Sequence, residues 1–240
     1  MIERVVSALQ ESAATDRIII SMPDNLPVKT QAPALSSAFD EGILDHAIAD
    51  RSPVQSLLKL LPMLADETPF LVTTADHALL SATVIRQFLE QYEPARFDIA
   101  AAMLPLECLS RKYPEQKRTS LMFRGVGYKA CNLFVFGNKK VAEKVLLFWL
   151  AVEEKRKSPW QMVWHLGPLT LARYLTGTLA LPDAVARLGA RTGTRLQAVM
   201  LKIPEAAIDV DTPQDLEFVR SIVAPDLSTS ADIATDDTPR

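Results

Sequence analysis

The sequence predicts a three-layer α/β domain, in which a mostly parallel β-sheet carries helices on both faces. Short apolar segments alternate along the chain with longer segments of helical periodicity. The apolar segments are rich in β-branched residues and show little polar alternation, which is typical of strands that are buried on both faces. The connections between these segments are short, and this favours helices that return the chain to the same edge of the sheet.

The first half of the chain contains most of this alternation. A helix is expected at the start because Ile2, Val5, Val6 and Leu9 recur at helical spacing. A segment rich in proline and polar residues is expected to be a loop. In chain order we expect a helix over 1–14, a strand over 17–21, a loop over 22–33, a helix over 54–64, a strand over 69–76, a helix over 79–93 and a strand over 97–104.

The second half departs from the simple alternation. Two strands separated by Arg-Gly-Val-Gly form either a hairpin or two strands that cross the sheet edge. The whole of 1–223 is expected to be one domain, and the polar, acidic residues 224–240 a disordered tail. In chain order we expect strands over 118–123 and 128–136, a helical insertion over 138–192, strands over 195–202 and 206–210, and a helix over 212–223 with Thr212 as its N-cap.

The composition of the 240 residues excludes several classes of protein. Hydrophobic residues make up 48% and charged residues 23%, as in ordinary soluble domains. A formal net charge of -3 provides no basic field for nucleic acid. The two cysteines give neither a disulfide framework nor metal-ligand spacing, and they favour a cytoplasmic location. We recognise no targeting segment and no membrane span.

The end of the predicted strand 69–76 is the first candidate for chemistry. Thr73, Thr74, Asp76 and His77 follow the apolar part of this strand. Ligands of parallel α/β sheets lie beyond the carboxyl ends of the strands, so Asp76 is expected at a ligand. The alternative is that Asp76 caps the helix that begins near Leu79.

A second acidic site lies late in the chain. Asp209 and Asp211 alternate with Val210, so both carboxylates are expected on one side of a strand end. Two carboxylates this close repel each other unless a cation offsets the repulsion, and a magnesium ion carried by a nucleotide would do so. The alternative is that Asp211 or Thr212 caps the following helix.

The segment between residues 111 and 136 contributes positive charge and one buried amide. Its cations suit an anionic ligand, although a solvated loop explains them equally well. Asn132 lies on a predicted buried strand and needs a hydrogen-bond partner, either a substrate or a neighbouring loop. Cys131 is expected to be a buried structural thiol. The cations are Arg111, Lys112, Lys117, Arg118, Arg124 and Lys129.

Both acidic segments carry a family resemblance. The strand that ends in Thr-Thr-Ala-Asp-His-Ala-Leu-Leu and the segment Ala-Ile-Asp-Val-Asp-Thr-Pro-Gln-Asp-Leu resemble two elements of nucleotidyltransferases. The second is the more specific of the two. Among these enzymes the chain is most similar to the molybdenum-cofactor-guanylyltransferase-like group, which has a glycosyltransferase-A-like Rossmann fold of the nucleotide-diphospho-sugar transferase type.

The resemblance implies transfer of a nucleoside monophosphate from an NTP to a phosphorylated or other anionic acceptor, with release of pyrophosphate. It implies a magnesium ion held by Asp76 together with Asp209 or Asp211. It also implies three further sets of residues: for catalysis Asp76, Arg118 and Lys129, for the nucleotide Ser52, Ser56, Thr74 and Asp76, and for the acceptor Arg118, Lys129 and Asn132. The alternative for Ser52 is an N-cap followed by Pro53 at the first helical position.

The start of the chain departs from the family. Family members open with a central strand and a glycine-rich phosphate loop, whereas no glycine precedes Gly42 here. The resemblance therefore implies that the first strand is missing, through truncation, a misplaced start or a genuinely shortened protein, and that this form could be inactive. Without that strand, the strands expected over 17–21 and 69–76 would each lose a partner or would pair directly.

Other functions and features are left open by the sequence. The alternatives to nucleotidyl transfer are a glycosyltransferase that uses a nucleotide sugar and a non-catalytic nucleotide-binding remnant. The glycosyltransferase is disfavoured because such enzymes usually carry their Asp-x-Asp motif in mid-chain, whereas here it lies near the end. The nucleotide base, the acceptor and a homodimer also stay open.

Overall fold

The computed structural model describes residues 1–24, 32–116, 120–153 and 167–232, with side chains up to residue 224. The strands are β1 (Ile18–Met22), β2 (Leu44–Ile48), β3 (Phe70–Thr73), β4 (Ile99–Pro105), β5 (Leu121–Phe123), β6 (Val126–Phe136) and β7 (Leu196–Met200). The α-helices are α1 (Ile2–Ser12), α3 (Ser36–Asp40), α4 (Pro53–Leu60), α5 (Ala82–Gln91), α6 (Leu106–Lys112), α7 (Lys139–Glu153), α9 (Pro168–Leu175), α10 (Leu181–Thr192) and α11 (Pro213–Asp232). Short 3-10 turns are η1 (Pro33–Leu35), η2 (Leu61–Met63) and η3 (Pro204–Ala207).

The main sheet has five strands, in the order β3-β6-β4-β7, with β5 paired to β6 as a hairpin. β4 and β7 are parallel, and β6 pairs antiparallel with β3, β4 and β5. Within this sheet β6 therefore runs against the other four strands. Of the two arrangements expected for these two strands, the structure has the hairpin, and a sheet in which most strands point the same way is confirmed.

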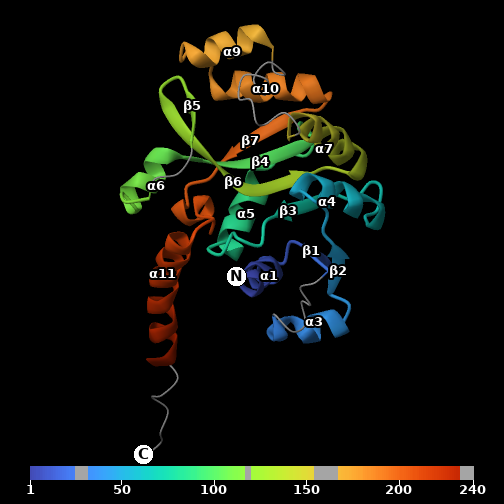
Figure 1. Ribbon diagram of the computed structural model, residues 1–240, viewed down its shortest axis with the longest axis vertical. Coiled ribbons are helices and arrows are strands. Elements are labelled where there is room, and N and C mark those ends of the chain that lie inside the picture. The colour runs from blue at the N-terminus through green and yellow to red at the C-terminus, as the bar shows by residue number, and fades with distance from the viewer. Residues whose placement is uncertain (25–31, 117–119, 154–166, 233–240) are drawn as a thin grey trace, which may run out of the picture.

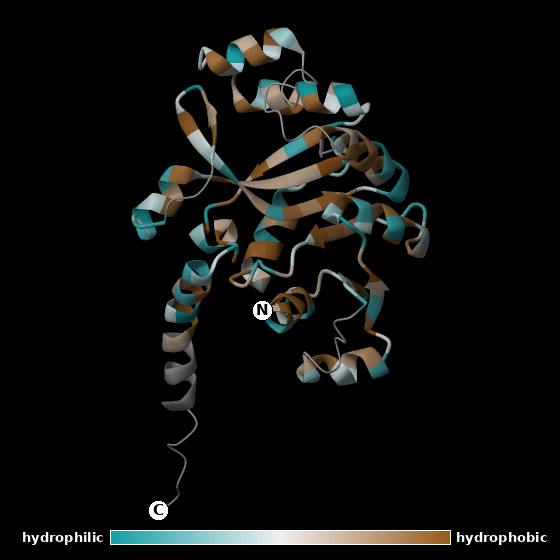
Figure 2. Ribbon diagram, viewed as in Figure 1, coloured by the Kyte–Doolittle hydropathy of each residue, from teal (hydrophilic) through white to brown (hydrophobic). Residues whose placement is uncertain are grey.

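Helices cover both faces of the main sheet, which makes the three layers visible in Figure 1. One face packs on α1 and α5 through a large core that includes Val6, Ile85 and Leu104. The other face packs on α4 and α7 through a smaller core around Phe136 and Leu146. Figure 2 shows the strands of this sheet as largely hydrophobic, as expected for strands covered on both faces. The three-layer α/β class is confirmed.

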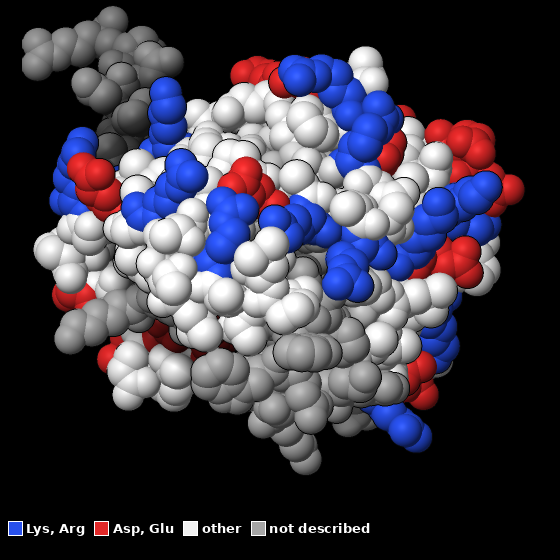
Figure 3. All heavy atoms as spheres, turned by 90° about the horizontal axis from the view of Figure 1, so that it is seen from above, with Lys and Arg blue, Asp and Glu red and all other residues white. Residues whose placement is uncertain are grey.

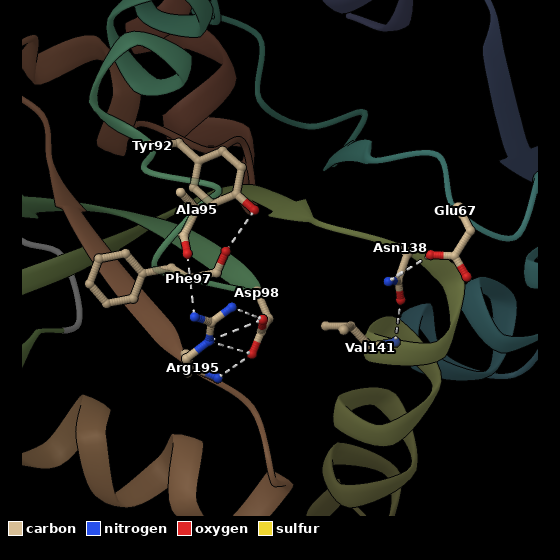
Figure 4. Close-up of polar contacts among 8 residues, drawn as sticks. All are labelled: Glu67, Tyr92, Ala95, Phe97, Asp98, Asn138, Val141 and Arg195. Atoms are coloured by element: carbon tan, nitrogen blue, oxygen red, sulfur yellow. Dashed lines mark hydrogen bonds and ion pairs between the residues drawn. The ribbon is translucent and has the colours of Figure 1, made fainter.

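An ion pair between Arg195 and Asp98 joins the amino ends of β4 and β7 (Figure 4). The guanidinium of Arg195 contacts both carboxylate oxygens of Asp98, with Nη2 at 2.6 Å from Oδ1, and its backbone N–H donates to Oδ2 at 2.7 Å. The Tyr92 hydroxyl donates to the Phe97 carbonyl at 3.1 Å beside this pair. These contacts hold β7 in register with β4 at the sheet end opposite to the candidate site.

A second, two-stranded sheet consists of β1 and β2, which run parallel. It packs on the same large core as α1 through Ile18 and Ile20. No strand pairing joins β1 to β3 among the described residues, so the two sheets are separate there. The direct pairing that was one of the two arrangements expected for these strands is therefore absent among the described residues.

Several element boundaries differ from the expectation. The prediction of a strand over 206–210 is wrong. The 3-10 turn η3 occupies the start of this range, and the residues that follow pair with no strand of the described sheets. β2 is missing from the expected elements, since its alternation of Leu44, Asp45 and His46 gives a weak strand signal. The last helix continues to Asp232, into the segment that was expected to be disordered. The expected helical insertion holds α7, α9 and α10.

The surface that carries α9 and α10 is mixed in charge. Figure 3 shows Lys and Arg side chains running across this side of the molecule, with Asp and Glu among them. The Arg173 guanidinium lies 2.7 Å from the Asp183 carboxylate, and Arg187 donates to the Thr170 hydroxyl at 3.1 Å.

Among the helices that the structure describes, none combines the length and the apolar character that crossing a membrane requires.

Candidate functional site

The carboxyl ends of β3, β4 and β7 lie at one edge of the main sheet, and β6 crosses this edge. β3 ends at Thr73, which is paired with Leu133 of β6, and Leu104 near the end of β4 is paired with Lys129. The chain that leaves β7 forms η3 and returns to the same place. Polar side chains from β6 and from the loops after β3 and β7 are thereby brought together.

Asp76 lies in the turn after β3 and does not cap the next helix. The N-cap of α5 is Ser81, whose hydroxyl accepts from the Val84 backbone N–H at 3.3 Å. The Asp76 carboxylate instead accepts a hydrogen bond from the Thr74 hydroxyl. Its backbone carbonyl accepts from the Val210 N–H at 3.1 Å, which ties the first acidic segment to the second.

Asp209 is a buried carboxylate with two donors from β6. The Lys129 ammonium lies 3.0 Å from Oδ2, and the Asn132 amide donates to the same oxygen at 3.2 Å. The side chains of Lys129 and Asp209 are only 16% and 10% exposed. A buried ion pair with an added hydrogen bond is costly to break from either side. The structure thus brings together three residues that the sequence singled out from distant segments.

Asn132 adopts an unusual backbone conformation. The pairing of β6 with β4 shifts register between Ala101 and Met103, which are paired with Phe134 and Ala130. Asn132 lies inside this bulge with φ 45°, in the left-handed region that asparagine tolerates better than most residues. Bulges and left-handed non-glycine residues are frequent next to functional sites.

His77 lies beside the acids and is 1% exposed. Its Nδ1 is 3.3 Å from the Thr73 hydroxyl, and its Nε2 makes no hydrogen bond with any described residue. Burial lowers the pKa of His77 to about 4, against the opposing effects of the nearby Ala206 backbone and of the carboxylates of Asp76 and Asp209. The imidazole is therefore neutral at physiological pH. The sequence places His77 at the end of this strand but indicates no role for it, since its position beside Asp76 gives no sign of its burial.

Cys131 lines the same small hollow as His77, Asn132 and Asp209. It is 2% exposed, and burial raises the pKa of its thiol to about 12. A thiol with so high a pKa carries almost no thiolate at neutral pH, so it is a poor nucleophile. This agrees with the expected structural role.

Asp211 does not share the environment of Asp209. It is exposed, because the residues around it form no strand and the alternation on which the pairing of the two acids rested is absent. The cap of α11 comes from its neighbours: the Asp215 N–H donates to the Thr212 hydroxyl at 3.2 Å, and the Thr212 N–H donates back to the Asp215 carboxylate at 2.9 Å. The predicted N-cap at Thr212 is confirmed, in the form of a reciprocal capping box.

Ser52 and Ser56 both serve the first turn of α4. The Ser52 hydroxyl accepts from the Gln55 N–H, and Pro53 occupies the first helical position, as the capping alternative predicted. The Ser56 hydroxyl accepts from the Asp50 N–H at 2.8 Å and donates to the Ser52 carbonyl. Contact with a nucleotide base stays a prediction for both serines.

The four described cations of the expected cluster each have a separate partner. On α6, Arg111 pairs with Glu107 and Lys112 pairs with Glu205. Arg124 donates to the Thr178 carbonyl, and Lys129 points to the buried Asp209. Lys117 and Arg118 lie outside the described residues, so the role expected for Arg118 stays a prediction.

Asp76 and Asp209 are the carboxylates of this site that would hold a magnesium ion. Among the residues that the structure describes, no group of three or more His, Cys, Asp and Glu side chains is arranged to hold a metal ion. Asp76 directly precedes His77 in the chain, and Asp209 lines the same small hollow as His77. Magnesium usually takes one or two carboxylates, together with water and substrate phosphates. The donor set therefore suits a nucleotide-borne ion better than a resident one.

Comparisons with known proteins bear on the family and the fold of this chain. A sequence model described as the MobA-like NTP transferase domain matches residues 1–122. No sequence among curated proteins matches the chain. The matched part includes β3, the Asp76 turn and β4, and it ends before the β6 residues and Asp209.

Solved structures with a similar fold include three bacterial proteins. A hypothetical transferase from Thermus thermophilus is 24% identical, with a TM-score of 0.72 over 90% of this chain and 85% of that one. The 4-diphosphocytidyl-2C-methyl-D-erythritol synthase of Anaerococcus prevotii is 12% identical, with a TM-score of 0.56 over 93% and 88%. The 2-C-methyl-D-erythritol 4-phosphate cytidylyltransferase of Thermus thermophilus is 14% identical, with a TM-score of 0.51 over 92% and 87%. At these identities the likeness concerns the fold.

Proposed function

This chain belongs to the MobA-like NTP transferase domain family, and from that premise we propose that it transfers a nucleoside monophosphate from an NTP to a phosphorylated or other anionic acceptor, releasing pyrophosphate. One observation carries the proposal. Polar side chains from the turn after β3, from β6 and from the segment after η3 converge at the carboxyl edge of the main sheet, where α/β folds bind their ligands. These residues are Asp76, Lys129, Asn132 and Asp209.

In the proposed reaction an acceptor oxygen attacks the α-phosphorus of the NTP. A new P–O bond forms, the bond to the bridging oxygen of the β-phosphate breaks, and pyrophosphate leaves with that oxygen. The protein contributes position and charge rather than a covalent intermediate. The Lys129 ammonium neutralises phosphate charge, and Arg118 assists from the segment before β5.

The two carboxylates at this edge have a separate role in the proposal. Asp76 and Asp209 would hold magnesium, and the ion would supply positive charge that offsets the charge on the phosphates of the NTP. The Thr74 hydroxyl orients the Asp76 carboxylate, to which it already donates. Base contact by Ser52 and Ser56, a ligand role for Asp211, a homodimer and a cytoplasmic location remain expectations from the sequence.

The first experiment is thermal unfolding of the chain with each of the four NTPs, with and without magnesium. A ligand at 100 times its Kd adds about 2.7 kcal/mol to the free energy of unfolding, which is a clear shift in Tm. We expect one NTP to raise Tm in a magnesium-dependent way, and Asp76→Ala to abolish the shift. Pyrophosphate release in the presence of candidate anionic acceptors then tests turnover.

The other outcomes separate the alternatives. A shift with a nucleotide sugar but with no NTP would identify a glycosyltransferase. A shift with an NTP but no pyrophosphate release with any acceptor would favour a nucleotide-binding remnant. A cooperative transition that no nucleotide changes would overturn the proposal.

A further inference from the structure

The two donors to Asp209 come from positions that a regular strand would separate. Lys129 and Asn132 are three residues apart on β6, and side chains at that spacing in a regular strand point to opposite faces of the sheet. Here both reach the same oxygen, Oδ2 of Asp209, at 3.0 and 3.2 Å. The difference arises between them, at the bulge in which Asn132 takes its left-handed conformation.

The position of this bulge also matters. The pairing of β3 with β6 ends at Thr73 and Leu133, so Asn132 is the first residue of β6 beyond the end of β3. The loop that carries Asp76 begins at this point. Asn132 thus lies between the turn after β3 and the segment after η3, and its amide links β6 to the second of them.

We propose that Asn132 is a positioning residue, whose left-handed backbone aims its amide at Asp209 and fixes the Asp209–Lys129 pair in the geometry that receives the nucleotide and its magnesium. This inference rests on the proposed function. Glycine would adopt the same backbone without strain but would provide no donor. Asparagine accepts some backbone strain and supplies the hydrogen bond, which is the combination that a positioning role requires.

The test compares Asn132→Gly with a control in which only strain is relieved. Ala13 is also left-handed, with φ 54°, but it caps α1 and is not part of the site. We expect Asn132→Gly to weaken magnesium-dependent binding of the NTP identified above by roughly tenfold, as loss of a hydrogen bond to a charged group does. Ala13→Gly should leave that affinity unchanged. Affinity is measured by titration calorimetry of the folded proteins.

A second measurement does not depend on nucleotide. The side-chain amide signals of Asn132, assigned by their loss in Asn132→Gly, are followed by NMR as Asp209 is changed to Asn. A marked shift of these signals is expected if the amide is bound to the carboxylate, and unmoved signals would overturn the proposed orientation.

The outcomes distinguish this inference from the proposed function. If the wild type binds no NTP, the proposed function fails and the positioning role fails with it. If the wild type binds and Asn132→Gly binds equally well, only the positioning role fails. If Asn132→Gly unfolds at a similar temperature to the wild type but has lost affinity, a purely structural role for the amide is excluded and the inference stands.

Discussion

The two ends of the main sheet each carry an ion pair, but the pairs differ in their surroundings. At the amino ends of β4 and β7, the side chains of Arg195 and Asp98 are 58% and 27% exposed and share several hydrogen bonds. At the carboxyl ends, Lys129 and Asp209 are largely buried and lie beside a neutral histidine and a left-handed asparagine. Both pairs join segments that are far apart in the sequence.

This difference in burial indicates that the Arg195–Asp98 pair joins two strands, whereas the Lys129–Asp209 pair belongs to a candidate ligand-binding site. An exposed pair in water contributes little beyond holding two strands in register. A buried pair is maintained against a desolvation cost, and an anionic ligand that enters can draw on the charge of its lysine. This contrast between the amino and the carboxyl ends of the strands can be tested by changing each ion pair in turn.

The largest effect is expected from breaking the buried pair. Lys129→Met leaves Asp209 charged and buried without its cation, which should lower the free energy of unfolding by about 4 kcal/mol. Urea unfolding followed by circular dichroism measures it. Changing both partners at once, by combining Lys129→Met with Asp209→Leu, should cost less than the single change. An equal or greater loss in the double variant would contradict the desolvation argument.

The two ends should also respond to different ranges of pH. The pKa of His77 is lowered from 6.5 to about 4 in the fold, so the unfolded chain binds the proton more tightly. Stability is therefore full above pH 6.5 and falls as the pH drops towards 4, by at most about 3 kcal/mol. Chemical denaturation at a series of pH values measures the slope, and His77→Gln should flatten it.

At the amino end the loss comes at lower pH. The hydrogen bond and charge of Arg195 hold the pKa of Asp98 below its usual value of 3.8. The stabilisation that this carboxylate provides is present above that value and is lost as the pH falls through the lowered pKa.

A loss of stability that persists between pH 6.5 and 4 in His77→Gln would argue against the assignment of that loss to the histidine.

A smaller effect is expected from the exposed pair. Arg195→Met should lower the free energy of unfolding by much less than Lys129→Met does, because water solvates the charge that is left on Asp98. Nucleotide affinity should not change, since Asp98 lies at the opposite end of the strands. The same urea series provides the comparison, and a cost equal to that of Lys129→Met would remove the contrast between the two ends.

The smallest effect is expected from the capping box of α11. Thr212→Ala removes the hydroxyl that accepts from the Asp215 N–H and should cost about 0.5–1 kcal/mol. Thr212→Ser keeps the hydroxyl and is the matched control. Both variants are compared by Tm, and equal values for them would show that the hydroxyl contributes nothing.

The strands and caps that depend on local sequence were predictable. The runs at β1, β3 and β4 are short and β-branched or apolar. The helices that begin at Pro53 and Pro213 each follow a residue with a side-chain hydroxyl, and the proline occupies the first helical position. This pattern acts within a single turn. The prediction of a strand over 206–210 was wrong because Pro204 starts a 3-10 turn. The apolar residues of this segment, among them the buried Ile208, resemble those of a strand.

The site was predictable only in its parts. Lys129, Asn132 and Asp209 were each singled out by residue type and position, but their mutual contacts depend on the pairing of β6 between β3 and β4. The bulge at Asn132 has no glycine to signal it. The burial of His77 follows from packing against η3 and β6, which local sequence does not encode.

The antiparallel course of β6 has a consequence for synthesis on the ribosome. Lys129 and Asn132 are made with β6, and this strand can pair with β3 and β4 as soon as it emerges. Their common partner, Asp209, follows only after α7, α9, α10 and β7 have been translated. Until that segment has been made, a nascent chain carries the cation without its carboxylate, so this edge of the sheet cannot be complete before the segment after β7 has docked.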